Sequence, residues 1–244
     1  MTHESAQESM ELERKYEVSG DTPLPATAAF AAAGFTASAP QTHELVATYF
    51  DTPGHDLATR GLALRSRAGG KDAGWHLKER TPEGVRELGW EPSTTMPAGV
   101  IAELGARIGE NAALVAPAAE IRTTRVITML REIAAATGSA ADTAAAPEVI
   151  ELADDQVLAI DHVQGVRRAW REWEAELMPG ADAALLDVVE PVLLAAGATH
   201  SLSFAKIARA TGQLSAAARA AGATAAQLAA LAELDVTDRA AAQE

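Results

Sequence analysis

The chain has 244 residues, with 34 acidic and 20 basic side chains, a net charge of −14 and no cysteine. This length suits one large domain or two small ones, and the lack of cysteine excludes disulfides and thiolate metal sites. The negative charge argues against a general nucleic-acid-binding surface. Without a long apolar run or a basic, apolar leader, we expect a cytoplasmic protein that binds neither DNA nor a membrane, and a homodimer is left open.

The first half of the chain predicts short strands joined by tight turns. Residues 11–19, ELERKYEVS, form the first expected strand, and a helix is expected to begin near Pro25 and end at Gly34. The further strands are expected at residues 42–52, 62–68, 75–80 and 85–91. Their connections are a turn at 53–61 and hairpins at 69–74 and 81–84, and a helix is expected at 97–109.

The second half predicts longer strands and more helix. Strands are expected at residues 120–133, 148–153, 156–163 and 167–178, with Asp154 and Asp155 in a turn between the second and the third. Residues 134–147 are a low-complexity Ala/Gly/Ser segment and are expected to form a surface loop. A helix ending at Gly197 and an Ala-rich helical segment from Ser203 complete the chain.

About nine strands, mostly joined by hairpins, predict an α+β fold that is mostly β, with an antiparallel closed or nearly closed sheet. No Gly-rich phosphate loop precedes a helix and no His-Glu-x-x-His motif occurs, so the sequence carries no P-loop, dinucleotide or zincin fingerprint.

Charged residues occupy one face of several strands, because alternate side chains of a strand point the same way. The rows are Glu11, Glu13 and Lys15; Arg65 and Arg67; His76 and Lys78; and Glu172, Glu174 and Glu176. For any single row, a solvated sheet face is the better explanation. Four such rows favour a charged interior, with Trp75, Leu77 and Trp173 facing outward against helices.

A charged interior is costly unless its charges are paired or bound to a ligand. Seven of the twenty basic residues fall at Arg60, at Arg86 or between them, which indicates either a local anion site or a solvated hairpin with ordinary charge alternation. A triphosphate carrying Mg²⁺ or Mn²⁺ fits both signs, since carboxylates suit these hard ions and Arg and Lys bind phosphate oxygens.

The sequence resembles the CYTH family, also called triphosphate tunnel metalloenzymes. The first matching segment is ELERK at 11–15, a Glu-x-Glu-x-Lys signature. The others follow in the family's order: YFDTPGHDLATRGLALRSR, WHLKER, EIRTTR, ELADDQV, REWEAEL and SFAKIARATG. The signature alone would be weak, but the ordered set covers residues 10 to about 212.

The resemblance implies a closed eight-stranded antiparallel β-barrel, a tunnel with flanking helices, that holds a triphosphate and two divalent ions. The metal ligands that it implies are Glu11, Glu13, Asp155, Glu172, Glu174 and Glu176. The residues that it implies for substrate binding are Lys15, Arg65, Arg67, Lys78, Arg125 and Lys206, to which we add Arg86 from the basic segment. Lys15, Lys78 and Arg65 are also expected to be catalytic, by neutralising charge on the transferred phosphoryl group.

Two positions depart from the family's pattern. The usual Ser-x-Ser-Lys is Ser203, Phe204, Ala205, Lys206 here, and Thr123 stands where a basic residue is common. Both could loosen phosphate contacts. We expect residues 1–9 to be disordered, 10–212 to form the tunnel domain and 213–244 to be an Ala-rich helical tail, too short for the CHAD helical domain that follows in some bacterial members.

The expected function is metal-dependent hydrolysis of the terminal phosphate of inorganic triphosphate or a related compound. Two alternatives stay open from the sequence. One is an adenylyl cyclase, which would use the same metals and phosphate contacts but attack the α-phosphorus. The other is a polyphosphate-binding module without turnover.

Overall fold

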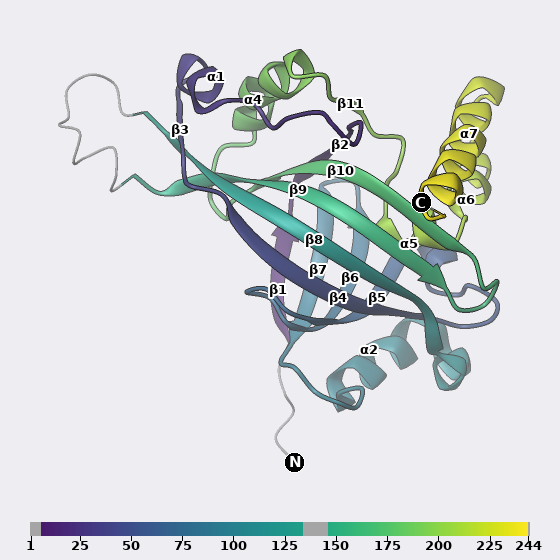
Figure 1. The fold of residues 1–244 in the computed structure, drawn as a ribbon. Coiled ribbons are helices and arrows are strands. Elements are labelled where there is room, and N and C mark those ends of the chain that lie inside the picture. The colour runs from purple at the N-terminus through teal and green to yellow at the C-terminus, as the bar shows by residue number, and fades with distance from the viewer. Residues whose placement is uncertain (1–5, 134–145, 244) are drawn as a thin grey trace.

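One curved sheet dominates the computed structural model of the chain, which describes residues 6–133 and 146–243 (Figure 1). The strands of its first half are β1 (Gln7–Glu11), β2 (Glu13–Glu17), β3 (Phe35–Ala37), β4 (Gln41–Asp51), β5 (Leu62–Ala68), β6 (Gly74–Thr81) and β7 (Gly84–Trp90). Those of its second half are β8 (Ala116–Glu132), β9 (Glu148–Asp161), β10 (Arg167–Leu177) and β11 (Thr199–His200). Apolar and polar side chains alternate along them, as expected for a sheet whose two faces meet different surroundings.

The strands pair antiparallel in the order β1-β7-β6-β5-β4-β8-β9-β10-β2-β11, and β3 pairs with β8. This eleven-stranded order has two ends, so the closed eight-stranded barrel that we predicted is not confirmed. The sheet order has two ends because the strand pairing changes at Leu12, the one residue between β1 and β2. Before Leu12 the chain pairs with β7, and after it with β10, so one extended segment serves both ends of the sheet.

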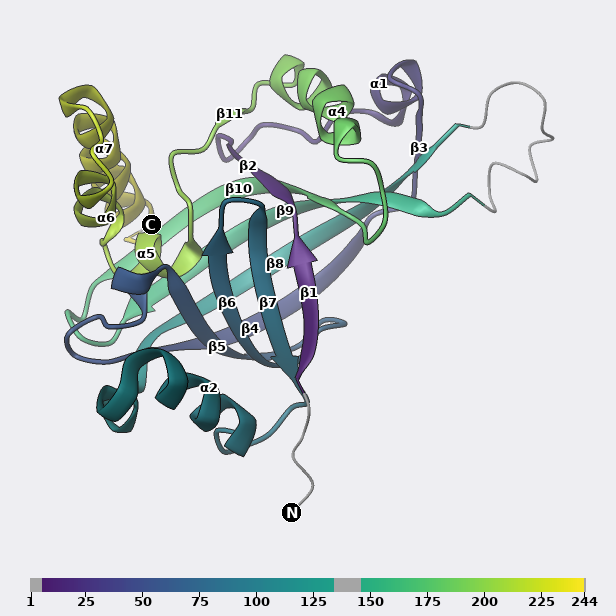
Figure 2. The same ribbon diagram turned by 180° about the vertical axis from the view of Figure 1, so that it is seen from behind.

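The helices are α1 (Thr27–Ala32), α2 (Ala98–Ile108), α4 (Ala184–Ala195), α5 (Lys206–Ala210), α6 (Leu214–Ala220) and α7 (Ala225–Ala241), with 3₁₀ turns η1 (Ala58–Arg60) and η2 (Gly109–Leu114). Helices α1, α2 and α4 lie outside the curved sheet, with α1 and α4 near one another (Figures 1 and 2). Helix α5 packs against the inner face of the sheet, where Ile207 and Ala210 join a cluster that includes Tyr49 and Val157, and α6 and α7 follow it. None of the helices in the described part of the chain has the length and apolar character needed to cross a membrane.

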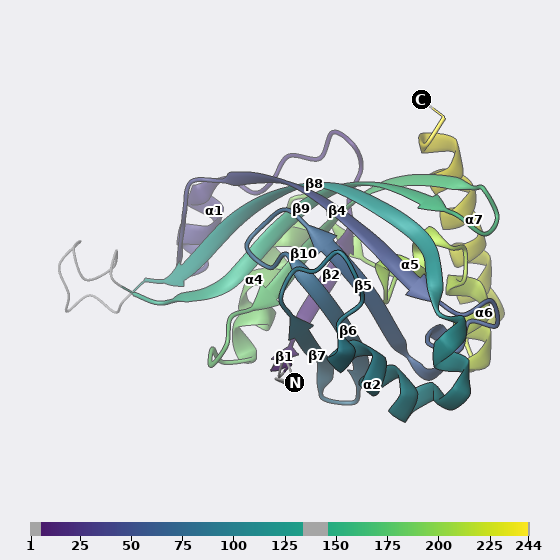
Figure 3. The ribbon, with the colours of Figure 1, turned by 90° about the horizontal axis from the view of Figure 1, so that it is seen from below.

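Helix α2 covers the outer face of β5, β6 and β7, as the view from below shows (Figure 3). Leu64 and Leu77 pack there against Val100, Leu104 and Ile108 of the helix. The i, i+4, i+8 spacing of these three residues places them on one helical face. Burial of each such side chain contributes about 1.5–3 kcal/mol. The prediction that Trp75 and Leu77 face outward against a helix is therefore confirmed.

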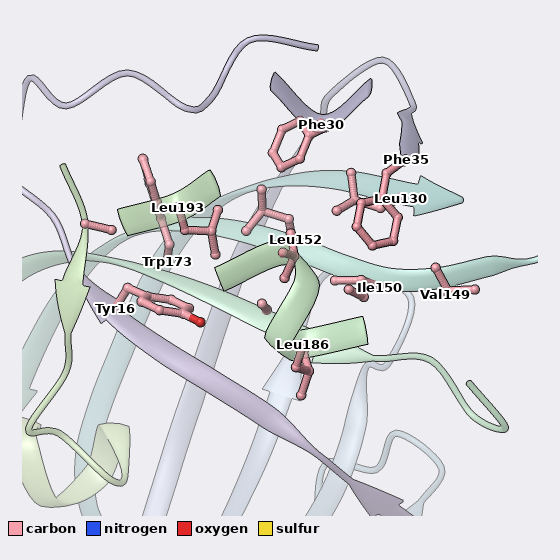
Figure 4. Close-up of a cluster of buried hydrophobic side chains, with 13 residues drawn as sticks. Tyr16, Phe30, Phe35, Leu130, Val149, Ile150, Leu152, Trp173, Leu186 and Leu193 are labelled. Atoms are coloured by element: carbon pink, nitrogen blue, oxygen red, sulfur yellow. The ribbon is translucent and has the colours of Figure 1, made fainter. Parts of the chain in front are cut away.

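A second core lies under α1 and α4 (Figure 4). Trp173 and Leu152 of the sheet pack with Leu186 and Leu193 of α4 and with Phe30 of α1. Trp173 is fully buried, which confirms the outward direction predicted for it. Because Trp173 faces out, its neighbours Glu172 and Glu174 face the other way, toward the interior of the curved sheet.

Three local predictions are wrong or untestable. Residues 148–161 form one uninterrupted strand, β9, so Asp154 and Asp155 do not lie in a turn. Asp155 instead faces Arg125 of β8 and Glu172 of β10 in the middle of the sheet. Gln7 to Ser9, which we assigned to a disordered N-terminus, belong to β1. Residues 1–5 and most of the predicted loop, 134–145, lie outside the described residues.

Candidate active site

A cavity of about 1170 Å³ lies inside the curved sheet. Eight Lys or Arg and six Asp or Glu line it, in a chain that is strongly acidic overall. The basic residues are Lys15, Arg65, Arg67, Lys71, Lys78, Arg80, Arg125 and Lys206. The acidic residues are Glu11, Glu13, Asp72, Glu151, Glu174 and Glu176. The predicted charged interior is thus present.

The two signs come largely from different parts of the sheet. Arg65 and Arg67 of β5, Lys78 of β6 and Arg125 of β8 form what we call the basic wall. The carboxylates come mainly from β9, β10 and β2, which adjoin one another in the sheet order, and from Glu11 of β1, which Leu12 joins to β2; we call them the acidic wall. A ligand between the walls meets cations on one side and carboxylates on the other.

Arg67 shows how strongly positive the basic wall is. Burial, together with the nearby charges of Arg65 and Arg125, lowers the pKa of Arg67 to about 9. The guanidinium remains charged at neutral pH, and it is held by Asp72 of the β5–β6 loop. Such mutual repulsion among buried cations is relieved by a bound anion.

The β5–β6 loop, residues 69–73, reaches both walls. Asp72 pairs with Arg67, and Lys71 pairs with Glu151 of β9. Gly69 has φ +83°, and a Cβ there would lie 2.1 Å from the backbone oxygen of Glu44. Glycine is therefore needed for the loop to pass so close to β4.

Three carboxylates stand side by side on the acidic wall. Glu176 of β10 lies directly opposite Glu13 of β2 on one side and Glu151 of β9 on the other. Glu11 pairs with Lys78, and Glu13 pairs with Lys15 at 2.9 Å. Burial and the charge of Glu11, only partly offset by Lys78, raise the pKa of Glu176 to about 7. The repulsion among these groups marks where a cation would be most favourable.

A second carboxylate cluster is already neutralised by side chains. Oxygens of Asp155, Glu172 and Glu174 lie within 4.8 Å of one another. The Lys206 ammonium lies among them, 2.9 Å from Asp155, 2.5 Å from Glu172 and 2.6 Å from Glu174. Arg125 adds bonds to Asp155 and Glu174, and Lys15 contacts Glu174 from β2. Although burial alone would raise the pKa of Glu174, Lys15, Lys206 and Arg125 hold it well below its usual range.

The two carboxylate clusters are not equally suited to bind a metal ion. Glu11, Glu13 and Glu176 line the cavity and carry carboxylate charge that is not fully offset, and oxygen donors of this kind fit Mg²⁺ or Mn²⁺. Asp155 and Glu172, which we also predicted as ligands, do not line the cavity and instead hold Lys206. Glu174 lines the cavity and belongs to the second cluster as well.

Most of the predicted substrate-binding residues converge on the cavity, but Arg86 does not. Its guanidinium bonds Glu8 at 2.7 Å and contacts Glu79 at 3.4 Å. Since β7 alternates like every strand, Arg86 lies on the opposite face from Glu87, which contacts Lys78 at 3.2 Å and Arg65 at 3.6 Å. We missed Glu87 as a partner of the basic wall.

Glu151 was also missed, although its sequence context contained the signal. Residues 151, 153 and 155 share one strand face, so Glu151 belongs to the same row as Asp155. The predicted break at Asp154 separated the two residues and concealed this row. Arg209 was missed as well. It pairs with Glu17 and Asp238, and nothing in the sequence around Arg209 indicates these partners.

We expect Glu176 to make the metal-free protein progressively less stable as pH rises from about 4.5 to about 7, measured as the difference between the native protein and Glu176→Gln. The folded protein raises the pKa of Glu176, so the folded state binds this proton more tightly than the unfolded chain does. The resulting contribution to the free energy of unfolding is complete below the pKa of the unfolded chain. It is lost as pH rises through the pKa of the folded protein, and the loss is on the order of 3 kcal/mol. Urea unfolding in chelator at several pH values checks this.

Glu176→Gln is the control for this prediction, because the amide cannot titrate. Relative to this variant, the native protein should lose stability between pH 4.5 and 7, and added Mg²⁺ should stabilise the native protein more at pH 8 than at pH 5. Identical pH profiles for the two proteins would contradict the assignment of the shift to Glu176.

Fold and cavity together define a protein with a cavity of both charge signs inside a curved antiparallel sheet. The CYTH domain model matches residues 9–211, and the chain belongs to the CYTH family, as its motifs predicted. Members of this family act on triphosphates and depend on metal ions.

Two curated proteins of Mycobacterium tuberculosis are similar to this chain: Uncharacterized protein MT2285 of strain CDC 1551 and Uncharacterized protein Rv2226 of strain H37Rv. Each is 35% identical over 223 residues, which make up 84% of this chain and 41% of the relative. The chain therefore spans less than half the length of these relatives.

Two solved structures are similar to this chain at low sequence identity. A candidate adenylate cyclase from Bacillus halodurans has a TM-score of 0.54 and 17% identity, covering 83% of this chain and 97% of its own. A candidate adenylyl cyclase from Hippeastrum, reported to have a dominant triphosphatase activity, has a TM-score of 0.48 and 17% identity. It covers 89% of this chain and 99% of its own.

Proposed function

We propose that the protein is a metal-dependent triphosphatase that releases the terminal phosphate of inorganic triphosphate or a related triphosphate compound. The observation that carries this proposal is the opposition of a basic wall and an acidic wall across one cavity. The basic wall suits phosphate oxygens, and the carboxylates suit the divalent ions that accompany triphosphates.

Arg65, Arg67, Lys78 and Arg125 would bind the phosphate oxygens. In this proposal Lys15, Lys78 and Arg65 neutralise charge that builds on the transferred phosphoryl group and on the leaving group. Their own partners, Glu174, Glu87 and Glu11, orient them before substrate binds. Such preorganisation places the charges without a reorganisation cost during the reaction.

Glu11, Glu13 and Glu176 would hold a divalent cation, with Glu174 beside them on β10. When bound, this ion supplies Lewis-acid polarisation of phosphoryl oxygens and a more acidic water at neutral pH. Asp155 and Glu172 act in this proposal by fixing Lys206 at the edge of the site.

A panel of inorganic triphosphate, ATP and other organic triphosphates, assayed with Mg²⁺ and with Mn²⁺, tests the proposal. We expect phosphate release that requires metal. Formation of cyclic AMP from ATP without phosphate release would favour a cyclase instead. Tight binding of every triphosphate without turnover would favour a binding module.

We expect Arg65→Ala to weaken binding of inorganic triphosphate by about 1.5–3 kcal/mol, because a charge-assisted contact to phosphate is lost. Arg65 is largely buried in the basic wall, where Glu87 orients it. Calorimetric titration measures the effect. Arg86→Ala is the matched control, since this arginine lies outside the cavity lining, and its affinity should equal that of the native protein. Equal losses in both variants would contradict the role of the basic wall.

A further inference from the structure

The C-terminal helix α7 is fastened to the rest of the molecule by a buried ion pair. Asp238 of α7 accepts two hydrogen bonds from Arg209 of α5, at 2.7 Å from Nε and 2.9 Å from Nη2. Arg209 is 3% exposed and Asp238 is 2% exposed. This helix lies beyond residues 9–211, the part of the chain that the family model matches.

Arg209 also reaches the sheet. Its Nη1 donates to Glu17 of β2 at 2.9 Å and 3.0 Å and lies 3.7 Å from Oε2 of Glu172 on β10. The guanidinium lies over the ring of Trp170, 4.7 Å from the centroid. Arg209 is therefore surrounded by groups from β2, β10 and α7, each of which fixes part of its position.

Glu172 connects Arg209 to the cavity. Its Oε1 contacts the Lys206 ammonium at 2.5 Å, while its Oε2 faces Arg209. Lys206 and Arg209 are i and i+3 on α5, so both side chains project from the same face of this short helix. Asp238 thus contacts Arg209, Arg209 lies beside Glu172, and Glu172 contacts Lys206, which lines the cavity.

Helix α5 is too short to hold itself in place. It has five residues, and no side chain caps its N-terminus. Helices of this length depend on tertiary contacts. If Asp238 lost its charge, Arg209 would keep its own buried charge and would be drawn toward Glu172. It would then compete with Lys206 for the same carboxylate.

We propose that Asp238 is a positioning residue that acts through Arg209 and Glu172 to hold Lys206 at the cavity. In this proposal, helix α7 helps to fix the position of a residue that lines the cavity. The inference deepens the proposed function and rests on it for the part that concerns triphosphate binding.

The test compares Asp238→Asn with Asp235→Asn in the full chain. Asp235 lies on the same helix and bonds Arg168 at 2.6 Å, so its loss also breaks an Arg–Asp pair whose arginine is fully buried. Arg168 contacts the backbone oxygen of Ala210 and none of Asp155, Glu172, Glu174 and Lys206 in the described structure. Asp235→Asn therefore controls for a general loss of stability.

Calorimetric titration with inorganic triphosphate and Mg²⁺ is the first measurement. We expect affinity to fall roughly tenfold in Asp238→Asn, the size typical for losing a supporting contact behind a binding residue, and to stay within about twofold of native in Asp235→Asn. Equal affinities in the two variants would overturn the inference. Absence of binding in the native protein would instead refute the proposed function.

The second measurement does not need a substrate. The rate at which an amine-reactive reagent modifies Lys206, followed by peptide mass spectrometry, reports how well its carboxylates shield it. We expect faster modification in Asp238→Asn than in Asp235→Asn or the native protein, and equal rates would overturn the inference. Should Asp238→Asn fail to fold, Arg209→Lys replaces it, because a lysine keeps the buried charge but cannot donate to Asp238 and Glu17 with separate nitrogens as Arg209 does. A rate of Lys206 modification equal to the native one would then overturn the inference.

Discussion

Glu13→Gln is expected to lower the rate of triphosphate hydrolysis by about 10³-fold, because it removes one carboxylate charge from the proposed metal site. The amide has almost the same shape, so the strand and its pairing with β10 should persist. Glu13 lies directly opposite Glu176 and contacts Lys15, which places it between a metal-ligand candidate and a phosphate-binding candidate. Initial rates of phosphate release over a range of Mg²⁺ concentrations measure the effect.

Glu8→Gln provides the matched control for this experiment. It makes the same chemical change on β1, where Glu8 is exposed and pairs with Arg86 outside the cavity lining. This variant should keep native rates. Near-native turnover of Glu13→Gln at saturating Mg²⁺ would remove Glu13 from the metal site.

Glu174→Gln is expected to lower the free energy of unfolding by about 3–5 kcal/mol, the range seen when one partner of a buried ionic network is removed. Glu174 is 5% exposed and contacts Lys15, Arg125 and Lys206. Without its charge, three buried cations lose a shared partner. Urea denaturation in chelator, with both midpoint and slope recorded, measures the change.

Glu176→Gln, two residues further along β10, is the control with the opposite expected sign. Its carboxylate is repelled by its surroundings, so at pH 8 the amide should leave stability unchanged or increase it. A similar loss of stability in both variants would show that the two clusters do not differ in their charge balance.

The direction of the strand faces could be predicted from the sequence because period-two alternation decides it. Trp75, Leu77 and Trp173 lie under helices, whereas Lys78 and Glu174 on the opposite strand faces line the cavity. The basic wall followed from the same rule. Arg86 was predicted wrongly, because we assigned it to the substrate site from its position in a basic segment and did not consider which strand face it occupies.

The features that we did not predict depend on ion pairs between residues that are distant in sequence. An Asp-Asp pair favours a turn locally, yet Asp155 is fully buried in β9 because Arg125 and Lys206 neutralise it. We predicted an Ala-rich helical tail for residues 213–244, but its composition did not indicate that Asp235 and Asp238 attach α7 to β10 and α5 through ion pairs with Arg168 and Arg209. Composition does not report such partners.

The segment on either side of Leu12 has a consequence for the order of folding. Lys15 and Glu174 meet across 159 residues of chain, and both ends of the sheet depend on that segment. Contacts this distant in sequence form late, since the loop they close carries a large entropic cost. The hairpins β5–β6–β7 can form locally, but Glu11, Glu13 and Glu176 come together only when the N-terminal segment docks. We therefore expect Mg²⁺ to slow unfolding far more than it speeds refolding.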